Sequence, residues 1–516
     1  MNLTRTFLLL VFGCIFSASA AQQNILLIIA DDYGVDSSSL YHSTNNGASL
    51  PPTPNIVALA QNGVLFRNAY ANPLCSPTRA TSITGRHGFR TGVGDVVGMG
   101  TPALSVAEFT LPEAFAANSG LGYSLAQFGK WHLANGINAP GTIGGWPHFA
   151  GSLQGAISSF TNWTKTVNGV STANYTNYAT TDLVNDAVTW IQACGTNAWF
   201  AWAAFNAPHT PLHKPPNDLH SYDALSGTQA NINADPRPYY EAMVEAMDTE
   251  IGRLLASVNR TNTHIIFMGD NGTPNNLLQP PFPSGRGKDT LYEGGIHVPL
   301  IIAGPAVENP GWTNQTPVNA VDLFATILGL ANINVSATVP TNVTIDSESL
   351  LPLLQSDVDL SRYAYSEAFN ETTPSNSDGR ALRNGQFKLI QFYDGHEEFY
   401  DLINDAYETT NLFSRTLTAT EQGNYYNLLL KFTEFQNGVP ATVITNFSKT
   451  DLQFSITVQR TTNVVYSLWR TAELESLGWI PLTNALVVAN GSATVTLTDT
   501  NAANFQSFYR VVATAP

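Results

Sequence analysis

Cysteine and charge are both scarce in this sequence. Of its 516 residues only 3 are cysteine, and Asp, Glu, Lys and Arg together account for 12%. So few cysteines exclude a fold held by a network of disulfides. The hydrophobic content of 43% excludes a largely disordered chain, and the length predicts one large globular domain with smaller units attached.

Basic residues are scarcer than acidic ones. The chain has 23 Lys and Arg against 39 Asp and Glu, which gives a formal net charge of −16. Such a surface repels nucleic acids and anionic membranes, so neither is expected as a partner. Any binding of an anion must therefore depend on a few cations placed close to it.

Apolar runs long enough to span a membrane are also missing from the sequence. The stretch Phe7–Phe16 is too short, and with Arg5 before it and Ala18–Ala20 after it the first 20 residues are typical of a cleaved secretory signal. A lipoprotein signal at Gly13-Cys14 is the weaker alternative. Export to the periplasm or the medium is therefore expected.

From residue 23 to about residue 354, short apolar runs alternate with helical patterns. The apolar runs are bounded by Gly, Pro, Asp or Asn and comprise Ile25–Ala30, Tyr123–Phe128, Trp199–Phe205, Ile265–Met268 and Val298–Ala303. Continuous apolar runs of this length are typical of strands buried on both faces of a sheet. The segments between them predict helices, as at Thr181–Cys194 and Tyr239–Asn259. The pattern predicts an α/β fold with a mainly parallel sheet between helices.

Polar residues directly follow four of these predicted strands. They are Asp31 and Asp32, Lys130 and His132, His209, and Asp270 with Asn271. Ligands of open α/β sheets bind beyond the carboxyl ends of the strands. One such residue alone is more often a helix cap or a surface side chain, but four strand ends that carry them together indicate a functional site.

After about residue 356 the pattern changes to short alternating runs. These predict three antiparallel strands and a covering helix, at Tyr363–Glu367, Gly385–Phe392, His396–Tyr400 and Glu421–Phe435. A Gly-Val-Pro break at 438–440 precedes a β-patterned end. We therefore divide the chain into a signal peptide (1–20), a large α/β domain (21–355), an α+β subdomain (356–440) and an appended β-sandwich (441–516).

Cleavage of the signal would leave two cysteines, Cys75 and Cys194. The simplest interpretation is that the two cysteines pair with each other, or that both are buried and inert. The residues after Cys75 argue against it, because Ser76 suits a helix N-cap and Pro77 the first helical position. Cys75 would then lie just ahead of a helix N-terminus, where backbone N–H groups favour an anion, and Arg79 would face the same anion.

The run Cys75–Arg79, followed by Thr84–Arg86, resembles the signature of the type I sulfatases, in which the cysteine is oxidised to the aldehyde formylglycine. Further blocks resemble the family in its expected order, over about residues 23 to 436: Asn24–Asp32, Gly129–His132, Ala207–His209, Gly269–Gly272, Gly287–Lys288, Glu293–Gly295, Tyr400–Leu402 and Asn411–Leu412. Two positions depart from the pattern. Thr78 stands where Ser is usual, and His297 stands where Arg is usual, which is expected to alter contacts with substrate.

The resemblance implies an alkaline phosphatase-like fold and a metal ion at the strand ends. The implied metal ligands are Asp31, Asp32, Asp270, Asn271 and the modified Cys75. Because the protein side chains offer only oxygen atoms, Ca²⁺ is the expected ion, whereas zinc would recruit His or thiolate.

The resemblance also implies catalytic roles. In the family, the hydrated aldehyde carries two hydroxyls on one carbon, of which one attacks sulfur and the other ejects sulfate. Three cations, Arg79, Lys130 and Lys288, would balance charge on the sulfate oxygens. His209 would protonate the leaving alcohol, and His132 would hydrogen-bond the formylglycine and assist elimination.

We therefore predict an exported, calcium-dependent hydrolase of sulfate monoesters, with a sulfated carbohydrate or an aryl sulfate as substrate. A formylglycine-generating maturase is the implied partner. One alternative is a phosphonate or phosphodiester hydrolase of the same superfamily. The other is a non-catalytic protein that binds sulfated glycans and keeps Cys75 unmodified.

Overall fold

The computed structural model describes residues 22–98, 101–356, 360–370, 372–437, 444–449, 453–459, 465–471, 480–482, 494–499 and 508–514. The expected signal peptide, residues 1–20, lies outside this set. The chain divides into two compact units, one of Met1–Arg362 with Ser366–Asp378 and the other of Tyr363–Tyr365 with Gly379–Pro516. Within the described part of the chain, no helix is long and apolar enough to cross a membrane.

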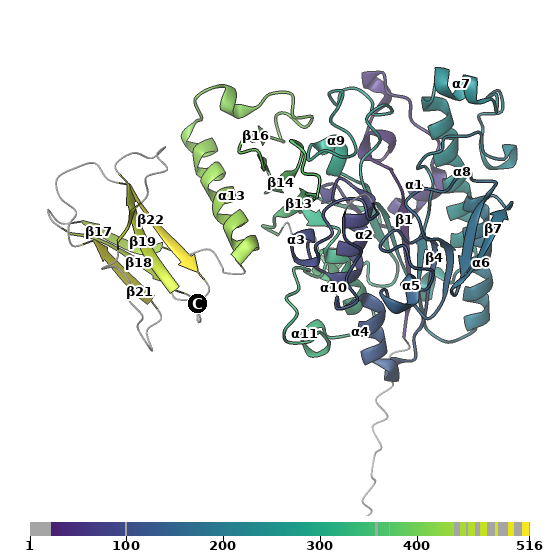
Figure 1. Cartoon of the computed structure of the whole chain (residues 1–516), viewed down its shortest axis with the longest axis horizontal. Coiled ribbons are helices and arrows are strands. Elements are labelled where there is room, and N and C mark those ends of the chain that lie inside the picture. Colours follow the sequence, from purple (N-terminus) through teal and green to yellow (C-terminus); the bar gives the residue numbers. More distant parts are fainter. Residues whose placement is uncertain are drawn as a thin grey trace, which may run out of the picture. The chain divides into compact units, whose positions relative to one another are not determined.

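A ten-stranded sheet forms the centre of the first unit (Figure 1). Its strands, in spatial order, are β11 (Trp312–Asn314), β2 (Gly63–Phe66), β10 (Leu300–Ala303), β9 (Thr263–Gly269), β1 (Asn24–Ala30), β8 (Trp199–Ala204), β4 (Ser124–Lys130), β5 (Phe149–Ser152), β6 (Trp163–Val167) and β7 (Val170–Tyr175). The central strands from β9 to β5 run parallel to one another. The predicted mixed, mainly parallel sheet is confirmed.

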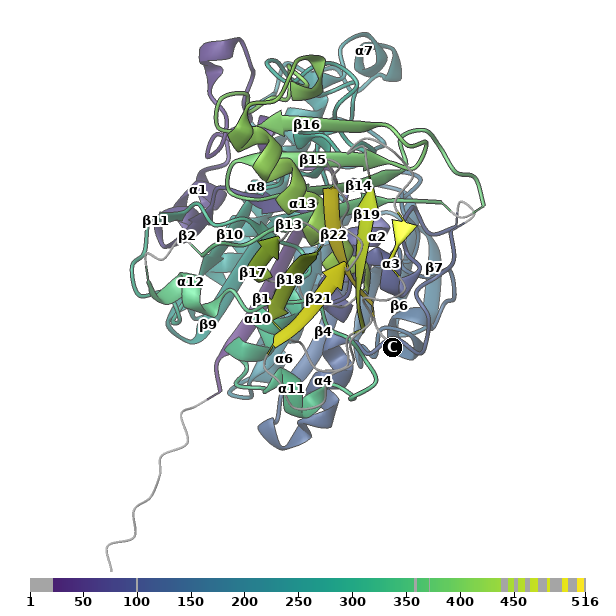
Figure 2. The ribbon, with the colours of Figure 1, turned by 90° about the vertical axis from the view of Figure 1, so that its left-hand side faces the viewer.

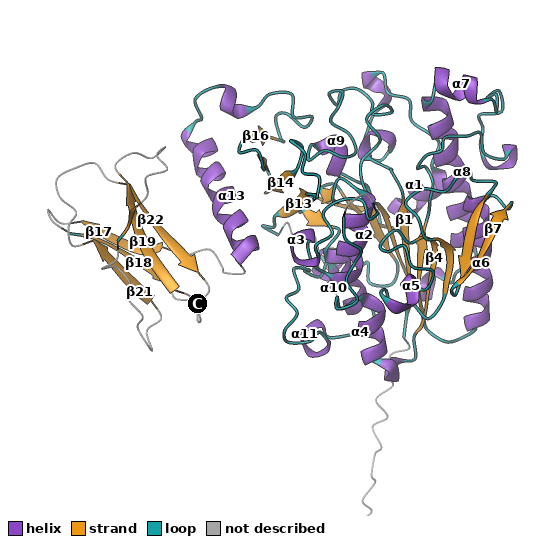
Figure 3. Cartoon of the chain, in the orientation of Figure 1, coloured by secondary structure: helices purple, strands orange, loops and turns teal. Residues whose placement is uncertain are grey.

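Helices cover both faces of this sheet (Figure 3). Alternate residues of β1 enter two separate cores, with Ile25, Leu27 and Ile29 in one and the residues between them in the other. The first core includes α2 (Cys75–Thr84), α4 (Leu111–Ala117) and α10 (Asp322–Leu330), and the second includes α1 (Pro54–Gln61), α6 (Ala179–Cys194) and α8 (Arg237–Ala256). Because each buried Ile or Leu contributes about 1.5–3 kcal/mol, strands buried on both sides hold the sheet firmly in place.

Shorter elements complete the first unit. The helices are α3 (Gly88–Thr91), α5 (Ala139–Thr142), α7 (Gln229–Ala234), α9 (Glu293–Ile296), α11 (Val335–Thr338) and α12 (Leu351–Gln355), and β3 (Ala69–Tyr70) pairs with β12 (Val318–Asn319). The β6–β7 hairpin was not predicted, because every residue of β7 is exposed or half-buried and the strand lacks an apolar run.

The strand β10 shows where apolar runs mislead. All four of its residues are buried, as in a parallel strand, yet it pairs antiparallel with both β9 and β2. An apolar run reports burial on two faces and carries no information on strand direction.

The second unit contains antiparallel sheets and one long helix. Strands β14 (Gly379–Arg383), β15 (Phe387–Phe392) and β16 (Glu397–Asp401) continue a sheet that begins with β13 (Ala364–Ala368), and α13 spans Ala419–Asn437. Of these, β14 was missed by the sequence pattern. The domain boundaries at residues 355 and 440 stay a prediction.

Two further three-stranded sheets confirm the predicted β-rich end of the chain (Figure 2). One has the order β17 (Ile444–Lys449), β18 (Phe454–Gln459) and β21 (Thr494–Asp499). The other has the order β20 (Ile480–Pro481), β19 (Val465–Thr471) and β22 (Phe508–Thr514). All the pairs in both sheets are antiparallel.

Candidate active site

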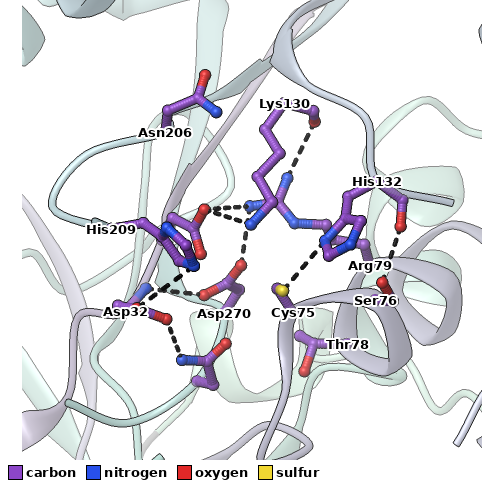
Figure 4. A network of polar contacts seen from close by, with 12 residues as sticks. Asp32, Cys75, Ser76, Thr78, Arg79, Lys130, His132, Asn206, His209 and Asp270 are labelled. Atoms are coloured by element: carbon purple, nitrogen blue, oxygen red, sulfur yellow. Dashed lines mark hydrogen bonds and ion pairs between the residues drawn. The ribbon is translucent and has the colours of Figure 1, made fainter. Parts of the chain in front are cut away.

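The two acidic strand ends lie side by side. Because β1 and β9 are adjacent and parallel, Asp31 and Asp32 meet Asp270 and Asn271 at one edge of the sheet. The amide of Asp32 donates to Oδ1 of Asp270 over 3.1 Å, and Nδ2 of Asn271 donates to Oδ1 of Asp32 over 2.7 Å. All of these side chains are buried, and ligand atoms of Asp31 and Asp32 lie within 4.8 Å of each other, so the four predicted metal ligands form one cluster. Figure 4 shows Asp32 and Asp270 of this cluster.

Each carboxylate of the cluster pairs with at least one cation, and Asp31 also lies 3.9 Å from Arg79. Lys130 Nζ lies 2.6 Å from Asp31 Oδ2, and Arg79 lies 2.8 Å from Asp270 Oδ2. Lys288 pairs with Asp32. Such pairing is what permits three carboxylates to be buried together, since an unpaired buried charge is costly.

Two oxygen atoms of the cluster have no hydrogen-bond partner. They are Oδ1 of Asp31 and Oδ1 of Asn271, both buried. A buried acceptor without a donor costs about 1–3 kcal/mol. A cation that binds oxygen would satisfy both atoms, so the donor set fits a calcium ion at this position.

Cys75 begins the helix α2. The prediction that Ser76 caps this helix is wrong: the N-cap is Leu74, and the helix runs from Cys75 to Thr84 before ending at Gly85, whose φ of 68° suits glycine. The Ser76 hydroxyl instead donates a hydrogen bond to the carbonyl oxygen of His132 over 2.9 Å. Cys75 therefore lies within the first helical turn.

His132 is held against Cys75. Its Nδ1 lies 3.2 Å from the sulfur atom (Figure 4). The backbone of His132 has a φ of 56°, an uncommon conformation for a residue other than glycine. A Cβ atom added at Gly155 would lie 2.3 Å from Cε1 of His132, so only glycine leaves room for the imidazole in this position.

His209 lies beside Asp32 (Figure 4). Its Nε2 is 3.8 Å from Oδ2 of Asp32. Its Nδ1 lies 2.8 Å from the carbonyl oxygen of Thr210, so Nδ1–H donates there and Nε2 faces the site without a proton in the neutral ring. The ligand atoms of Asp31, Asp32 and His209 all lie within 4.8 Å of one another.

Burial sets most of the protonation states. It raises the pKa of Asp270 to about 6, with a further contribution from the charge of Asp31. Burial acts on Asp32 in the same direction, but Lys288 and His209 outweigh it and hold the pKa of Asp32 well below its ordinary value. Burial also raises the pKa of the Cys75 thiol.

The two histidines are neutral near pH 7 for the same reason. Burial lowers the pKa of His132, and the charges of Lys130 and Arg79 lower it further. Burial lowers the pKa of His209 to about 4, although Asp32 opposes the shift. Both rings therefore bring a lone pair to the site until a further negative charge arrives.

The two departures from the sulfatase pattern are both accommodated inside the fold. The Thr78 hydroxyl accepts the N–H of Asn72 over 3.0 Å and lies 3.1 Å from the carbonyl oxygen of Leu74, so it fixes the turn before Cys75. The effect of His297 on contacts with substrate stays a prediction. Its ring stacks on Tyr70 at 5.1 Å and its Nε2 lies 2.7 Å from the carbonyl oxygen of Arg67, contacts that are structural.

Two polar residues near Lys130 were missed by the sequence argument. Asn206 follows β8, and its carboxamide lies 3.1 and 3.3 Å from the hydroxyl of Ser152, the last residue of β5. Like His209, Asn206 follows the end of β8 (Figure 4). The rule that functional residues follow strand ends therefore applies to it, but the sequence argument did not name it. Ser152 gave no signal, because β5 itself was not predicted.

Comparison with known proteins decides the family. A model of the sulfatase family matches residues 23–333. This chain belongs to the sulfatase family. A second model, for the C-terminal part of N-sulphoglucosamine sulphohydrolase, matches residues 287–433. Membership places the chain among the sulfuric ester hydrolases.

Individual sulfatases are similar at modest identity. Arylsulfatase J of Mus musculus is 29% identical over 335 residues, which cover 61% of this chain and 53% of that protein, so this chain spans about half of that relative. A sulfatase of Formosa agariphila is 27% identical over 483 residues, 76% of this chain and 84% of that one. The crystal structure of Ps i-CgsB matches with a TM-score of 0.66 at 25% identity over 80% of this chain and 92% of that one.

Proposed function

We propose that this sulfatase hydrolyses sulfate monoesters of a carbohydrate, with Cys75 converted to formylglycine and a calcium ion bound beside it. The observation that carries the proposal is the position of Cys75 in the first turn of α2, 3.2 Å from His132 and on the same helix as Arg79, which pairs with Asp270. A modified Cys75 would thus meet a proton-transfer group, while the helix joins it to the metal ligands.

The substrate class is proposed from the relatives. N-acetylgalactosamine-6-sulfatase of Sus scrofa is 27% identical over 392 residues, and the ulvan-active sulfatase of Formosa agariphila is 27% identical over 403 residues. A further structure of Ps i-CgsB contains a neocarrahexaose. The names of these proteins point to sulfated sugars, so we propose a sulfated carbohydrate here as well.

The metal would occupy the cluster of Asp31, Asp32, Asp270 and Asn271. A calcium ion held there would polarise the sulfate oxygens and the hydroxyl of the modified Cys75. It would also satisfy the two unpartnered oxygens of Asp31 and Asn271. Because a calcium ion would add two positive charges to a cluster whose three carboxylates are already paired, the carboxylates would hold Lys130 and Lys288 less firmly.

Those cations are then available to the sulfate group. Lys130 and Lys288 lie against the ligand carboxylates, so a small movement of either ammonium would bring it to a sulfate oxygen. Arg79 stays fixed, because its guanidinium donates to both Asp270 and the carbonyl oxygen of Lys130. Preorganised charges of this kind stabilise the charge that develops in the transition state.

The histidines would move the protons. His132 Nδ1 faces the reactive position and would take a proton from it during release of sulfate. His209 is neutral in the free site, and the negative charge of a bound sulfate would raise its pKa and let it protonate the leaving alcohol. Export through residues 1–20 and conversion of Cys75 by a formylglycine-generating maturase belong to the same proposal.

The experiment compares substrates on protein co-expressed with a maturase. We expect faster turnover of nitrophenyl sulfate than of nitrophenyl phosphodiester or phosphonate substrates, release of sulfate from at least one defined sulfated oligosaccharide, and loss of both activities in Cys75→Ala. A preference for phosphodiesters would favour the hydrolase alternative. Glycan binding that survives Cys75→Ala, with no turnover of any substrate by the unaltered protein, would show a binding protein.

A further inference from the structure

Thr273 lies behind the proposed metal ligands and joins the two turns that carry them. Its side chain is fully buried, and its hydroxyl donates to Oδ1 of Asp36. The same hydroxyl oxygen accepts the N–H of Gly34 over 3.3 Å. Gly34 and Asp36 belong to the turn that follows Asp31 and Asp32, whereas Thr273 belongs to the turn that follows Asp270 and Asn271.

The backbone of Thr273 holds a third segment. Its carbonyl oxygen accepts the N–H of Lys288 over 2.9 Å. Lys288 in turn reaches Asp32 through its ammonium group. One residue therefore connects both ligand turns with a proposed sulfate-binding lysine.

The surroundings of Thr273 leave little freedom. A Cβ atom added at Gly34 would lie 2.7 Å from the amide nitrogen and 2.9 Å from the hydroxyl oxygen of Thr273. Since the φ of Gly34 is −86°, glycine is needed there for this close approach and not for its backbone angle. Asp36 is also fixed from behind, because its Oδ2 accepts the N–H of Gln279 over 3.3 Å and lies 3.8 Å from Arg237.

We propose that the Thr273 hydroxyl is a positioning group that sets the spacing of the calcium ligands. Without it, the buried N–H of Gly34 loses its acceptor and Asp36 loses a donor, so the turn that carries Asp31 and Asp32 can move away from Asn271. Partners behind metal ligands typically change metal affinity by about 10- to 100-fold when they are removed. The inference rests on the proposed calcium site. It adds to that site a residue that is not itself one of the proposed ligands.

The test measures the dissociation constant of calcium by calorimetry on chelator-treated full-length protein. Thr273→Val keeps the shape of the side chain and removes the hydroxyl, and we expect it to weaken calcium binding about 10- to 100-fold. Thr273→Ser restores the hydroxyl and should bind within about threefold of the unaltered protein, less than the smallest loss expected for an outer partner.

Thr326 provides a matched control. It is buried, donates to the carbonyl oxygen of Asp322 over 2.6 Å and accepts the N–H of Leu350 over 2.8 Å, so Thr326→Val removes a similar hydroxyl away from the cluster. We expect it to lower the melting temperature without changing calcium affinity. Equal calcium affinity in Thr273→Val and Thr326→Val would overturn the inference.

The experiment distinguishes a failure of the inference about Thr273 from a failure of the proposed calcium site. Should Thr273→Val fail to fold, Gly34→Ala tests the same contact, because its added methyl group pushes against Thr273; unchanged calcium affinity in that variant would equally overturn the inference. Failure of the unaltered protein to bind calcium would instead refute the metal part of the proposed function, before any variant is compared.

Discussion

The sulfur atom of Cys75 lies 3.2 Å from Nδ1 of His132, and the next residue of the chain, Ser76, contacts the same histidine. The Ser76 hydroxyl donates to the carbonyl oxygen of His132 over 2.9 Å and accepts the N–H of Val97 over 3.1 Å. The side chain next to the reactive residue therefore fixes the backbone of its proton acceptor.

Removal of that hydroxyl should slow turnover. Ser76→Ala leaves a buried carbonyl and a buried N–H unpaired, which costs about 1–3 kcal/mol and lets His132 shift from Cys75. We expect kcat to fall at least about tenfold with little change in KM, as for loss of part of a general-base contribution. Ser82→Ala is the matched control, because Ser82 is equally buried on α2 but donates only to the carbonyl oxygen of Thr78. Rates are normalised to the formylglycine content of each variant, and equal kcat values in the two variants would refute the role of Ser76.

The proposed role of His209 predicts a dependence on the leaving group. Poor leaving groups need a proton in the transition state, whereas nitrophenolate does not. His209→Gln should therefore slow hydrolysis of a sugar sulfate by about 10²- to 10⁴-fold and hydrolysis of nitrophenyl sulfate by much less. The measurement is kcat/KM over a series of aryl sulfates with leaving groups of increasing pKa. An equal loss across the series would exclude proton donation by this histidine.

The pKa of Asp270 predicts how calcium binding changes with pH. In the calcium-free protein this pKa is raised to about 6 by burial and by Asp31, so below pH 6 a proton occupies the carboxyl group that calcium needs. Calcium affinity should be constant well above pH 6 and fall as the pH drops through it, by up to about tenfold per pH unit for one linked proton. The rise in melting temperature on calcium addition should shrink in the same window. A flat response between pH 5 and pH 7 would contradict this assignment.

Arg79 should not tolerate replacement by lysine. Its guanidinium donates to the carbonyl oxygen of Lys130 over 3.0 Å and to Asp270 over 2.8 Å, two contacts that one ammonium group on a different stem does not reproduce. We expect Arg79→Lys to lower kcat/KM by about 10²-fold or more, the scale seen when one preorganised charge is lost. Arg90→Lys is the control, because Arg90 pairs with a carboxylate outside the cluster, its Nε donating to both oxygens of Asp346. Similar losses in both variants would show a general effect on stability.

Much of the fold could be predicted from the sequence because strands that are buried on both faces consist mostly of apolar residues. The strands β1, β4, β8 and β9 are buried on both faces, so each is mostly apolar, and the rule that ligands gather at carboxyl ends predicted that Asp31 and Asp270 lie together. The hairpin of β6 and β7 and the strand β14 were not predicted, because exposed or half-buried residues interrupt their patterns.

Contacts that depend on tertiary geometry were not readable. The pattern of residues suggested that Ser76 caps a helix, yet its hydroxyl holds His132, 56 residues further along the chain. The stacking of His297 on Tyr70 and its contact with the backbone of Arg67 were likewise not predictable from the sequence. Thr273 gave no signal, since a threonine after a strand end is ordinary and its role depends on tertiary contacts with Gly34 and Asp36.

The most direct test of the account is the mass of the peptide that contains Cys75. Protein co-expressed with a formylglycine-generating maturase is digested and analysed by mass spectrometry, alongside protein made without the maturase. The account predicts a peptide of lower mass in the first sample, in which an aldehyde oxygen replaces the thiol sulfur, and sulfatase activity in proportion to that peptide. A Cys75 peptide that remains entirely a thiol, in protein that still hydrolyses sulfate esters, would contradict it.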